Sequence, residues 1–240
     1  MKNIKFLLII NLVILFMACK KDEKTESQLA SINVINAAVD VATIKVNNFG
    51  KPISWTNLTG VDGTVNYTGT TANKIYGIYQ PNARFAFEVV STPDTLRKVF
   101  VKDLDLVVGG VYSLYLTGRS PNFESVFVKE DIPYHTDSVA GVRFINLSSN
   151  SDPISVNITG NANGSGVTSL AYKASTEFKT YPAKSKNLSY AFQVRNVTTG
   201  ALLASYTLAT PRMLNVTLAF RGLVGTTGTT APVITRINNY

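Results

Sequence analysis

Few side chains in this sequence belong to the types that carry out covalent or metal chemistry. Its 240 residues include one cysteine and one histidine. These counts exclude a disulfide within one chain and a zinc site built from cysteine and histidine clusters. His135 is close in sequence to Asp137 and Ser138, but a Ser-His-Asp triad is assembled across a pocket rather than along one short segment. We therefore expect an exposed linker histidine and no catalytic residues.

Asp103 and Asp105 alternate along an expected strand, so both carboxylates face the same way. Two such groups could hold calcium weakly, but calcium takes several more oxygen ligands and usually a glycine-rich loop. A solvated strand face is the simpler interpretation, and no phosphate-cradling glycine loop is present. The sequence therefore predicts no metal site and no cofactor, and it indicates a protein that is not an enzyme.

The single cysteine closes an N-terminal segment with the pattern of a secretory signal. Two lysines precede an apolar stretch from Phe6 to Phe16, and the chain becomes strongly charged directly after Cys19. Residues 6–19 form an uncharged stretch of 14 residues, shorter than the roughly 20 that a spanning helix needs. A signal peptide over residues 1–18 follows, and an ordinary signal with a chance cysteine is the alternative.

Residues 15–19, Leu-Phe-Met-Ala-Cys, resemble the lipobox of a bacterial lipoprotein signal. The resemblance implies cleavage after Ala18, diacylglycerol on the Cys19 thiol and an acylated amine, which together anchor a protein stably in a membrane. The next residues resemble the charged signal that exports some lipoproteins to the outer face of the cell, with a merely solvated tether as the alternative. We expect an outer-membrane protein facing the exterior, or else the periplasm. The export residues are Lys20, Lys21, Asp22 and Glu23.

The charge balance does not indicate a nucleic-acid partner. Without Lys2 and Lys5, 21 basic and 15 acidic side chains remain in the mature chain. The basic residues are scattered, and none of the stretches interleaves several of them with aromatic residues as a single-strand binder would. We interpret the excess as a solvated basic surface.

An internal repeat is the most informative pattern in the mature chain. Residues 30–50 match residues 140–160 at a constant offset of 110, and residues 85–89 match residues 190–194 further along. Short runs rich in Val, Ile, Tyr, Phe and Thr alternate with Gly, Asn, Pro and Ser throughout, which predicts many short strands. The identities of the first block are Ala30/Ala140, Ile35/Ile145, Asn36/Asn146, Ile44/Ile154, Val46/Val156, Asn47/Asn157 and Gly50/Gly160.

The repeat predicts two copies of an all-β domain of about a hundred residues, a size that suits a seven-strand antiparallel sandwich. We place a flexible tether at residues 19–30, the first sandwich at 31–133, a linker at 134–139 and the second sandwich at 140–240. Apolar residues alternate with polar ones along the expected strands, which predicts one buried and one solvated face for each sheet.

Both copies resemble the domain of unknown function family 4397. The resemblance rests on residues 32–36 (INVIN), 44–47 (IKVN), 84–89 (RFAFEV) and 106–118 (LVVGGVYSLYLTG), and it covers essentially the whole mature chain. It implies an immunoglobulin-like β-sandwich in an extracytoplasmic bacterial protein. It implies no established activity and no catalytic residues.

Three aromatic residues in the first copy are candidates for contact with a ligand. Trp55, Tyr76 and Tyr79 lie in stretches without strong alternation, and aromatic rings on loops can stack on sugars or peptides. The alternative is that these rings fill the sandwich core. We expect a non-catalytic binding or adhesion module for an extracellular glycan or protein. A structural or spacer subunit of a cell-surface assembly is the alternative.

Overall fold

The computed structural model describes residues 29–49, 53, 55, 64–67, 73–79, 85–92, 94–96, 98–184, 188–209 and 212–239, with Tyr79 and Phe85 described by their backbone alone. The predicted signal peptide, Cys19 and the export residues lie outside these ranges. Apart from one short 3-10 helix, Gly228–Thr230, all the regular elements described are strands. None of the described residues belongs to a helix long and apolar enough to cross a membrane.

The first sandwich consists of two four-stranded sheets. One sheet has the order β4-β1-β7-β8 and the other the order β3-β2-β5-β6. Their strands are β1 (Leu29–Asn36), β2 (Thr43–Asn47), β3 (Val65–Asn66), β4 (Asn73–Tyr79), β5 (Phe85–Ser91), β6 (Lys98–Leu104), β7 (Val111–Arg119) and β8 (Asn122–Lys129).

The second sandwich repeats this topology strand for strand. Its sheets have the orders β12-β9-β15-β16 and β11-β10-β13-β14. Their strands are β9 (Val139–Asn146), β10 (Ile154–Ile158), β11 (Val167–Leu170), β12 (Lys179–Pro182), β13 (Ser189–Asn196), β14 (Leu202–Ala209), β15 (Asn215–Arg221) and β16 (Val233–Asn239).

The predicted fold, two tandem immunoglobulin-like β-sandwiches, is confirmed. Each copy has eight strands among the described residues instead of the expected seven, with four strands in each sheet. Pairing is antiparallel except where β1 runs parallel to β7 and β9 runs parallel to β15. Each sandwich has its own core, with Phe87 at the centre of one and Phe192 at the centre of the other.

One pair of repeated asparagines shows why the copies share these residues. Asn36 and Asn146 are fully buried at the ends of β1 and β9, and each accepts a hydrogen bond from the backbone N–H two residues on, at 3.2 and 3.1 Å. Their Nδ2 groups donate to the carbonyls of Val65 and Leu170, which lie in the matching strands β3 and β11. A buried carbonyl without a partner is costly, so these asparagines hold the same chain reversal in both copies.

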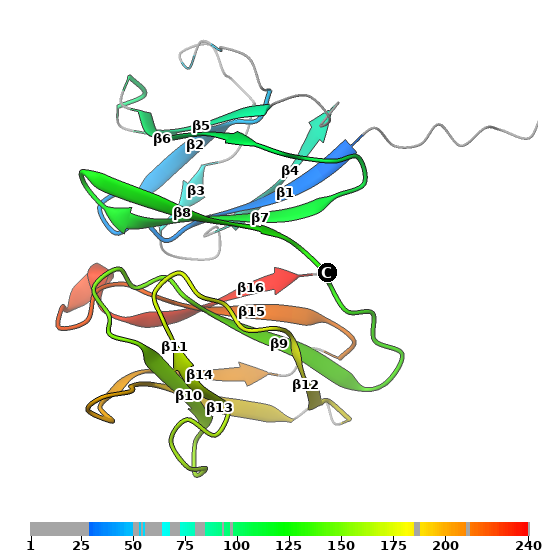
Figure 1. Ribbon diagram of the computed structural model, residues 1–240, viewed down its shortest axis with the longest axis vertical. Coiled ribbons are helices and arrows are strands. Elements are labelled where there is room, and N and C mark those ends of the chain that lie inside the picture. The colour runs from blue at the N-terminus through cyan, green and yellow to red at the C-terminus, as the bar shows by residue number, and fades with distance from the viewer. Residues whose placement is uncertain are drawn as a thin grey trace, which may run out of the picture.

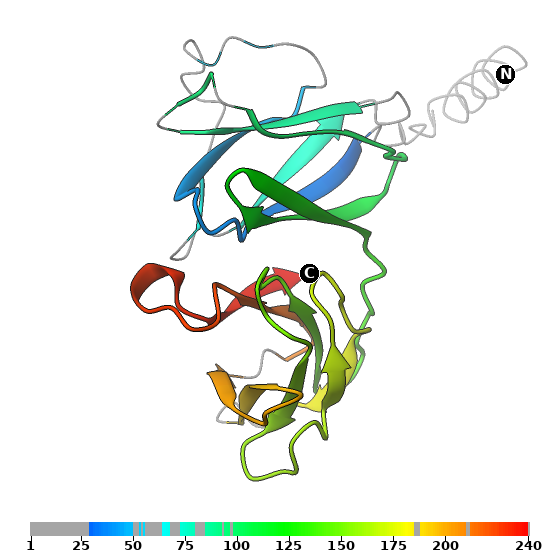
Figure 2. The ribbon, with the colours of Figure 1, turned by 60° about the vertical axis from the view of Figure 1, so that its left-hand side comes forward.

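The two sandwiches pack face to face, sheet β4-β1-β7-β8 against sheet β12-β9-β15-β16 (Figures 1 and 2). A shared apolar cluster fills the contact, and it draws residues from β1, β7, β9, β15 and β16 and from the turns that follow β1 and β9. The prediction of one solvated face per sheet is therefore wrong for these two sheets. Every residue of β15 is buried, because the neighbouring sandwich covers its second face. The cluster consists of Ile35, Ala37, Tyr115, Ile145, Leu147, Ala219 and Ile237.

Candidate functional site

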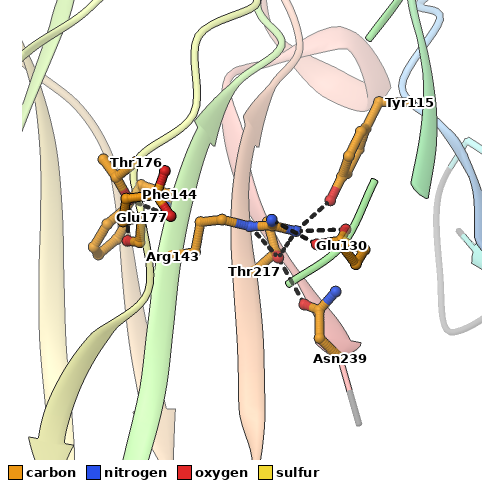
Figure 3. A network of polar contacts seen from close by, with 8 residues as sticks. All are labelled: Tyr115, Glu130, Arg143, Phe144, Thr176, Glu177, Thr217 and Asn239. Atoms are coloured by element: carbon orange, nitrogen blue, oxygen red, sulfur yellow. Dashed lines mark hydrogen bonds and ion pairs between the residues drawn. The ribbon is translucent and has the colours of Figure 1, made fainter. Parts of the chain in front are cut away.

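A charged pair lies buried between the two sandwiches. Arg143 of β9 donates to both carboxylate oxygens of Glu130, at 2.7 and 2.8 Å, and only 7% and 1% of the two side chains is exposed (Figure 3). Arg143 also donates to the hydroxyls of Tyr115 and Thr217. Burial alone lowers the pKa of Arg143, but the hydrogen bonds and charge of Glu130 outweigh burial and hold that pKa above its ordinary value. Because the guanidinium and the carboxylate both have hydrogen-bond partners, this ion pair is a fixed contact between the two sandwiches.

Polar and cationic contacts join the sandwiches at the other end of the interface. The Thr117 hydroxyl donates to the carbonyl of Leu147 at 2.8 Å. Glu124 of β8 accepts hydrogen bonds from Lys173 Nζ at 2.6 Å and from the Tyr172 hydroxyl at 2.8 Å. The Arg221 guanidinium lies 4.4 Å from the ring centre of Tyr67, within the range of a cation–π contact. Because contacts join the two sandwiches at both ends of their interface, we expect them to behave as one rigid body rather than as two independently moving domains.

The predicted linker is bound to the second sandwich. His135 Nε2 is 2.8 Å from Asn215 Oδ1, and Asn215 Nδ2 donates to the carbonyl of Pro133. His135 is half-buried, so the expectation of an exposed histidine is corrected. Its partner is an amide at the start of β15 rather than a nucleophile. Among the described residues, no three His, Cys, Asp or Glu side chains are grouped as metal ligands.

The second sandwich contains a cavity of about 140 Å³ on its open side. Strand β11 stops pairing at Val156, so on that side no described strand lies beside Ile158, which pairs with Phe192 of β13 on its other side. Opposite is β12, the edge strand of the other sheet. At about 30 Å³ per water molecule, the cavity holds roughly five waters or one ring-sized group. Its lining comprises Val156, Asn157, Ile158, Asn161, Ser165, Gly166, Lys179, Tyr181 and Phe192.

The lining has an apolar base and a polar rim. Tyr181 packs edge-on against Phe192, with ring centres 5.4 Å apart, and burial raises the pKa of Tyr181. Asn161, Ser165 and Lys179 are exposed around the opening. Asn157 is 99% buried and donates through Nδ2 to Gln193, but its Oδ1 has no hydrogen-bond partner. A buried acceptor without a donor is uncommon.

Strand register explains why the corresponding place in the first sandwich is filled. Tyr76 pairs with Ile32, and Lys179 pairs with Val142, which is the repeat counterpart of Ile32. Tyr76 and Lys179 therefore occupy equivalent positions on the edge strands β4 and β12. Tyr76 is 7% exposed and belongs to the core cluster. At equivalent positions, therefore, the first sandwich packs a large ring into its core and the second has an exposed lysine.

The structure describes the side chains of two of the three aromatic residues predicted to face a ligand. Tyr76 fills the core, which is the alternative that the sequence left open, so its role as a ligand-facing ring is corrected. Trp55 is half-buried in a turn whose flanking residues lie outside the described ranges. The side chain of Tyr79 is also outside them. The sequence pointed to the first copy, whereas the cavity is in the second. No signal in the sequence located it, because Lys179 is the first residue of a strand of only four residues.

Comparison with known proteins leaves the ligand open. No protein-family model and no curated protein matches the chain. Among solved structures, the chain is similar to a family 26 carbohydrate-binding module from Eubacterium rectale Amy13K in complex with maltoheptaose. The two sequences are 10% identical, the TM-score is 0.28, and the match covers 88% of this chain and 97% of that one. It is also similar to family 41 modules from streptococcal virulence factors that recognise alpha-glucan (9% identity, TM-score 0.26, 85% and 96% coverage). With TM-scores this low, neither likeness carries an argument about this protein.

Proposed function

We propose that the protein is a lipid-anchored, surface-exposed binding module without catalytic activity, and that its ligand inserts one group into the cavity of the second sandwich. The observation that carries the binding role is the opening at Lys179, where the first sandwich is closed by Tyr76. Anchoring rests on the lipobox-like segment that ends in Cys19 and on the charged export residues after it. The resemblance to family 4397 agrees with an extracytoplasmic role.

The residues that line the cavity indicate which kind of ligand it could bind. Tyr181, Phe192 and Val156 offer an apolar base, while the exposed Asn161 and Ser165 can donate and accept hydrogen bonds at the rim. A sugar ring presents an apolar C–H face and a rim of hydroxyls, which matches this division. A glycan of the cell exterior is therefore the favoured ligand, and a polar loop of a protein is the other candidate.

A substitution that copies the first sandwich tests the binding role. In the variant Lys179→Tyr, the tyrosine should fill the opening as Tyr76 does. We expect residues 20–240 to bind one class of glycan on a glycan array, and we expect Lys179→Tyr to weaken that binding at least about tenfold, equivalent to 1.4 kcal/mol. Lys184→Tyr adds the same ring at an exposed position outside the cavity and should bind like the wild type.

Two outcomes contradict this assignment. Equal binding by Lys179→Tyr and the wild type would place the ligand elsewhere on the molecule. If the protein binds only on a protein array, and Lys179→Tyr loses this binding, the cavity is still the binding site but its ligand is a protein rather than a glycan.

Anchoring has its own test. Cys19→Ser removes the acyl acceptor, so this variant should be released from membranes or remain unprocessed, as fractionation and mass spectrometry can show. A Cys19→Ser protein that is fully processed and still membrane-bound contradicts lipid attachment through this residue.

The alternative, a structural subunit of an assembly, is favoured by one edge strand. β14 (LLASYTLA) ends its sheet, and its eight residues contain neither charge nor proline. Natural edge strands are usually protected by such residues, since an open edge pairs readily with another chain. Ser205 and Thr207 are exposed on this strand. Loss of cell-surface assembly in Ser205→Lys, with Thr198→Lys as the control, would support this second function.

A further inference from the structure

The first strands of both sandwiches begin at the same end of the molecule. The backbone N–H of Glu130 donates to the carbonyl of Val111 at the start of β7, and the Glu130 side chain contacts Arg143 in the middle of β9. At the other end, Thr117 of β7 contacts Leu147 after β9. Strands β7 and β9 therefore run in the same sense. Since β1 is parallel to β7 and β15 to β9, all four strands start at one end.

We call this the entry end, because the described chain enters there at Leu29. It consists of Leu29, the turn 107–111, the linker 134–139 and residues 212–214. Backbone hydrogen bonds hold these segments in place, from Gly109 N–H to the carbonyl of Leu29 and from Met213 N–H to the carbonyl of Val139.

Exposed apolar side chains gather at the entry end. Among the described residues, six of the twelve large hydrophobic side chains that are exposed belong to its segments, so both sandwiches contribute. Lys184 and Arg212 add positive charge there, but Asp131 and Asp137 oppose it. These charges offset one another, so the exposed apolar side chains are the main feature of the entry end. The six are Val107 (47% exposed), Val108 (36%), Val111 (38%), Tyr134 (90%), Met213 (47%) and Leu214 (46%).

We infer that the entry end rests on the lipid surface, so that both sandwiches stand side by side on the membrane with their opposite ends directed away from it. This inference rests on the proposed lipid anchor. Nine residues lie between Cys19 and Leu29, and the ten Cα–Cα steps that connect these two residues span at most roughly 35 Å. The tether thus keeps the entry end close to the bilayer. Apolar side chains on a tethered protein gain from burial at the boundary between headgroups and acyl chains.

Tryptophan quenching by brominated lipid tests this orientation. Residues 19–240 are coupled through the single thiol of Cys19 to a maleimide lipid in vesicles of brominated phosphatidylcholine, so the test does not depend on acylation in the cell. Val108→Trp and Met213→Trp report on the entry end, and Leu96→Trp and Val197→Trp report on exposed sites at the opposite end. The signal of the parent protein, which arises from Trp55, is subtracted from each.

We expect both entry-end reporters to be quenched at least about twofold more than both opposite-end reporters, because bromine lies in the acyl region that the entry end contacts. Equal quenching at the two ends, or stronger quenching at the opposite end, would overturn the inference without affecting the proposed anchor. The same fragment without lipid is examined by analytical ultracentrifugation. A dimer abolished by Val108→Lys would assign the entry end to a second copy of the chain and would also overturn it. Circular dichroism confirms that each variant is folded.

Discussion

The contact between Arg143 and Glu130 shows how single residues fix the two sandwiches together. Removing one partner of a buried ion pair leaves the other charge uncompensated in the interface. We predict that Glu130→Gln lowers the free energy of unfolding by about 3–5 kcal/mol, measured by denaturant melts.

Replacing both partners provides the control for this prediction. The double variant Arg143→Met with Glu130→Leu leaves no buried charge, so its cost should be smaller than the sum of the two single costs. Strictly additive costs would show that the two side chains do not interact energetically.

Glu124 gives the interface a dependence on pH. Hydrogen bonds from Lys173 and then Tyr172 hold the pKa of Glu124 below its usual value, and the unfolded chain has no such partners. Its stabilising contribution is therefore complete above the unfolded pKa of roughly 4.3 and is lost as the pH falls through the folded pKa. We predict that Glu124→Gln flattens the decline of stability between about pH 5 and pH 3 in melts at stepped pH. An unchanged slope in Glu124→Gln would exclude this role.

At the scale of the strands, the two-residue alternation of the sequence correctly identified the core rows. Phe87 and Phe192 lie at matching positions and are 0% and 1% exposed. We predict that Phe192→Ala lowers the free energy of unfolding by about 3–5 kcal/mol, through lost burial and the cavity left behind.

Glu88→Ala is the control in denaturant melts. Glu88 lies next to Phe87 on the opposite face, and its ion pair with the exposed Lys98 is of a kind worth only about 0–1 kcal/mol. A costly Glu88→Ala together with a silent Phe87→Ala would mean that β5 presents its other face to the core.

The alternation could not predict that a second sandwich covers the polar rows. Ser113, Thr117 and Thr217 belong to the rows that the alternation assigns to a solvated face, yet they are at most 1% exposed. A period of two shows which face of a strand is more apolar, but it does not show whether the other face is covered. The repeat itself was visible in the sequence, because Asn36 and Asn146 are needed at the same chain reversal in both copies.

The cavity could not be predicted either, since it depends on the register of β12, a strand of four residues. Only that register places Lys179 where the first copy has Tyr76. In the sequence, Lys179 looks like any other solvated lysine. Prediction from the sequence therefore favoured the aromatic residues of the first copy.

At the scale of the whole molecule, side-by-side packing changes what two tandem domains can do. Sandwiches joined end to end would form a stalk, with one domain far from the anchor. Here the shared cluster around Ile35, Ile145 and Tyr115 makes one block, and both copies keep the same end toward the tether. The cavity of the second sandwich is thereby held in a fixed orientation by the first, which contributes rigidity to a binding module.

Calorimetry tests most directly whether the two sandwiches act as one unit. Because their interface is apolar at the centre and contains a buried ion pair, we predict that residues 20–240 unfold in a single thermal transition with equal calorimetric and van't Hoff enthalpies. Residues 31–133 and 140–240, expressed separately, should each unfold at a lower temperature than the intact protein, since each exposes its half of the interface. Two resolved transitions in the intact protein, at the temperatures of the separate halves, would contradict the account.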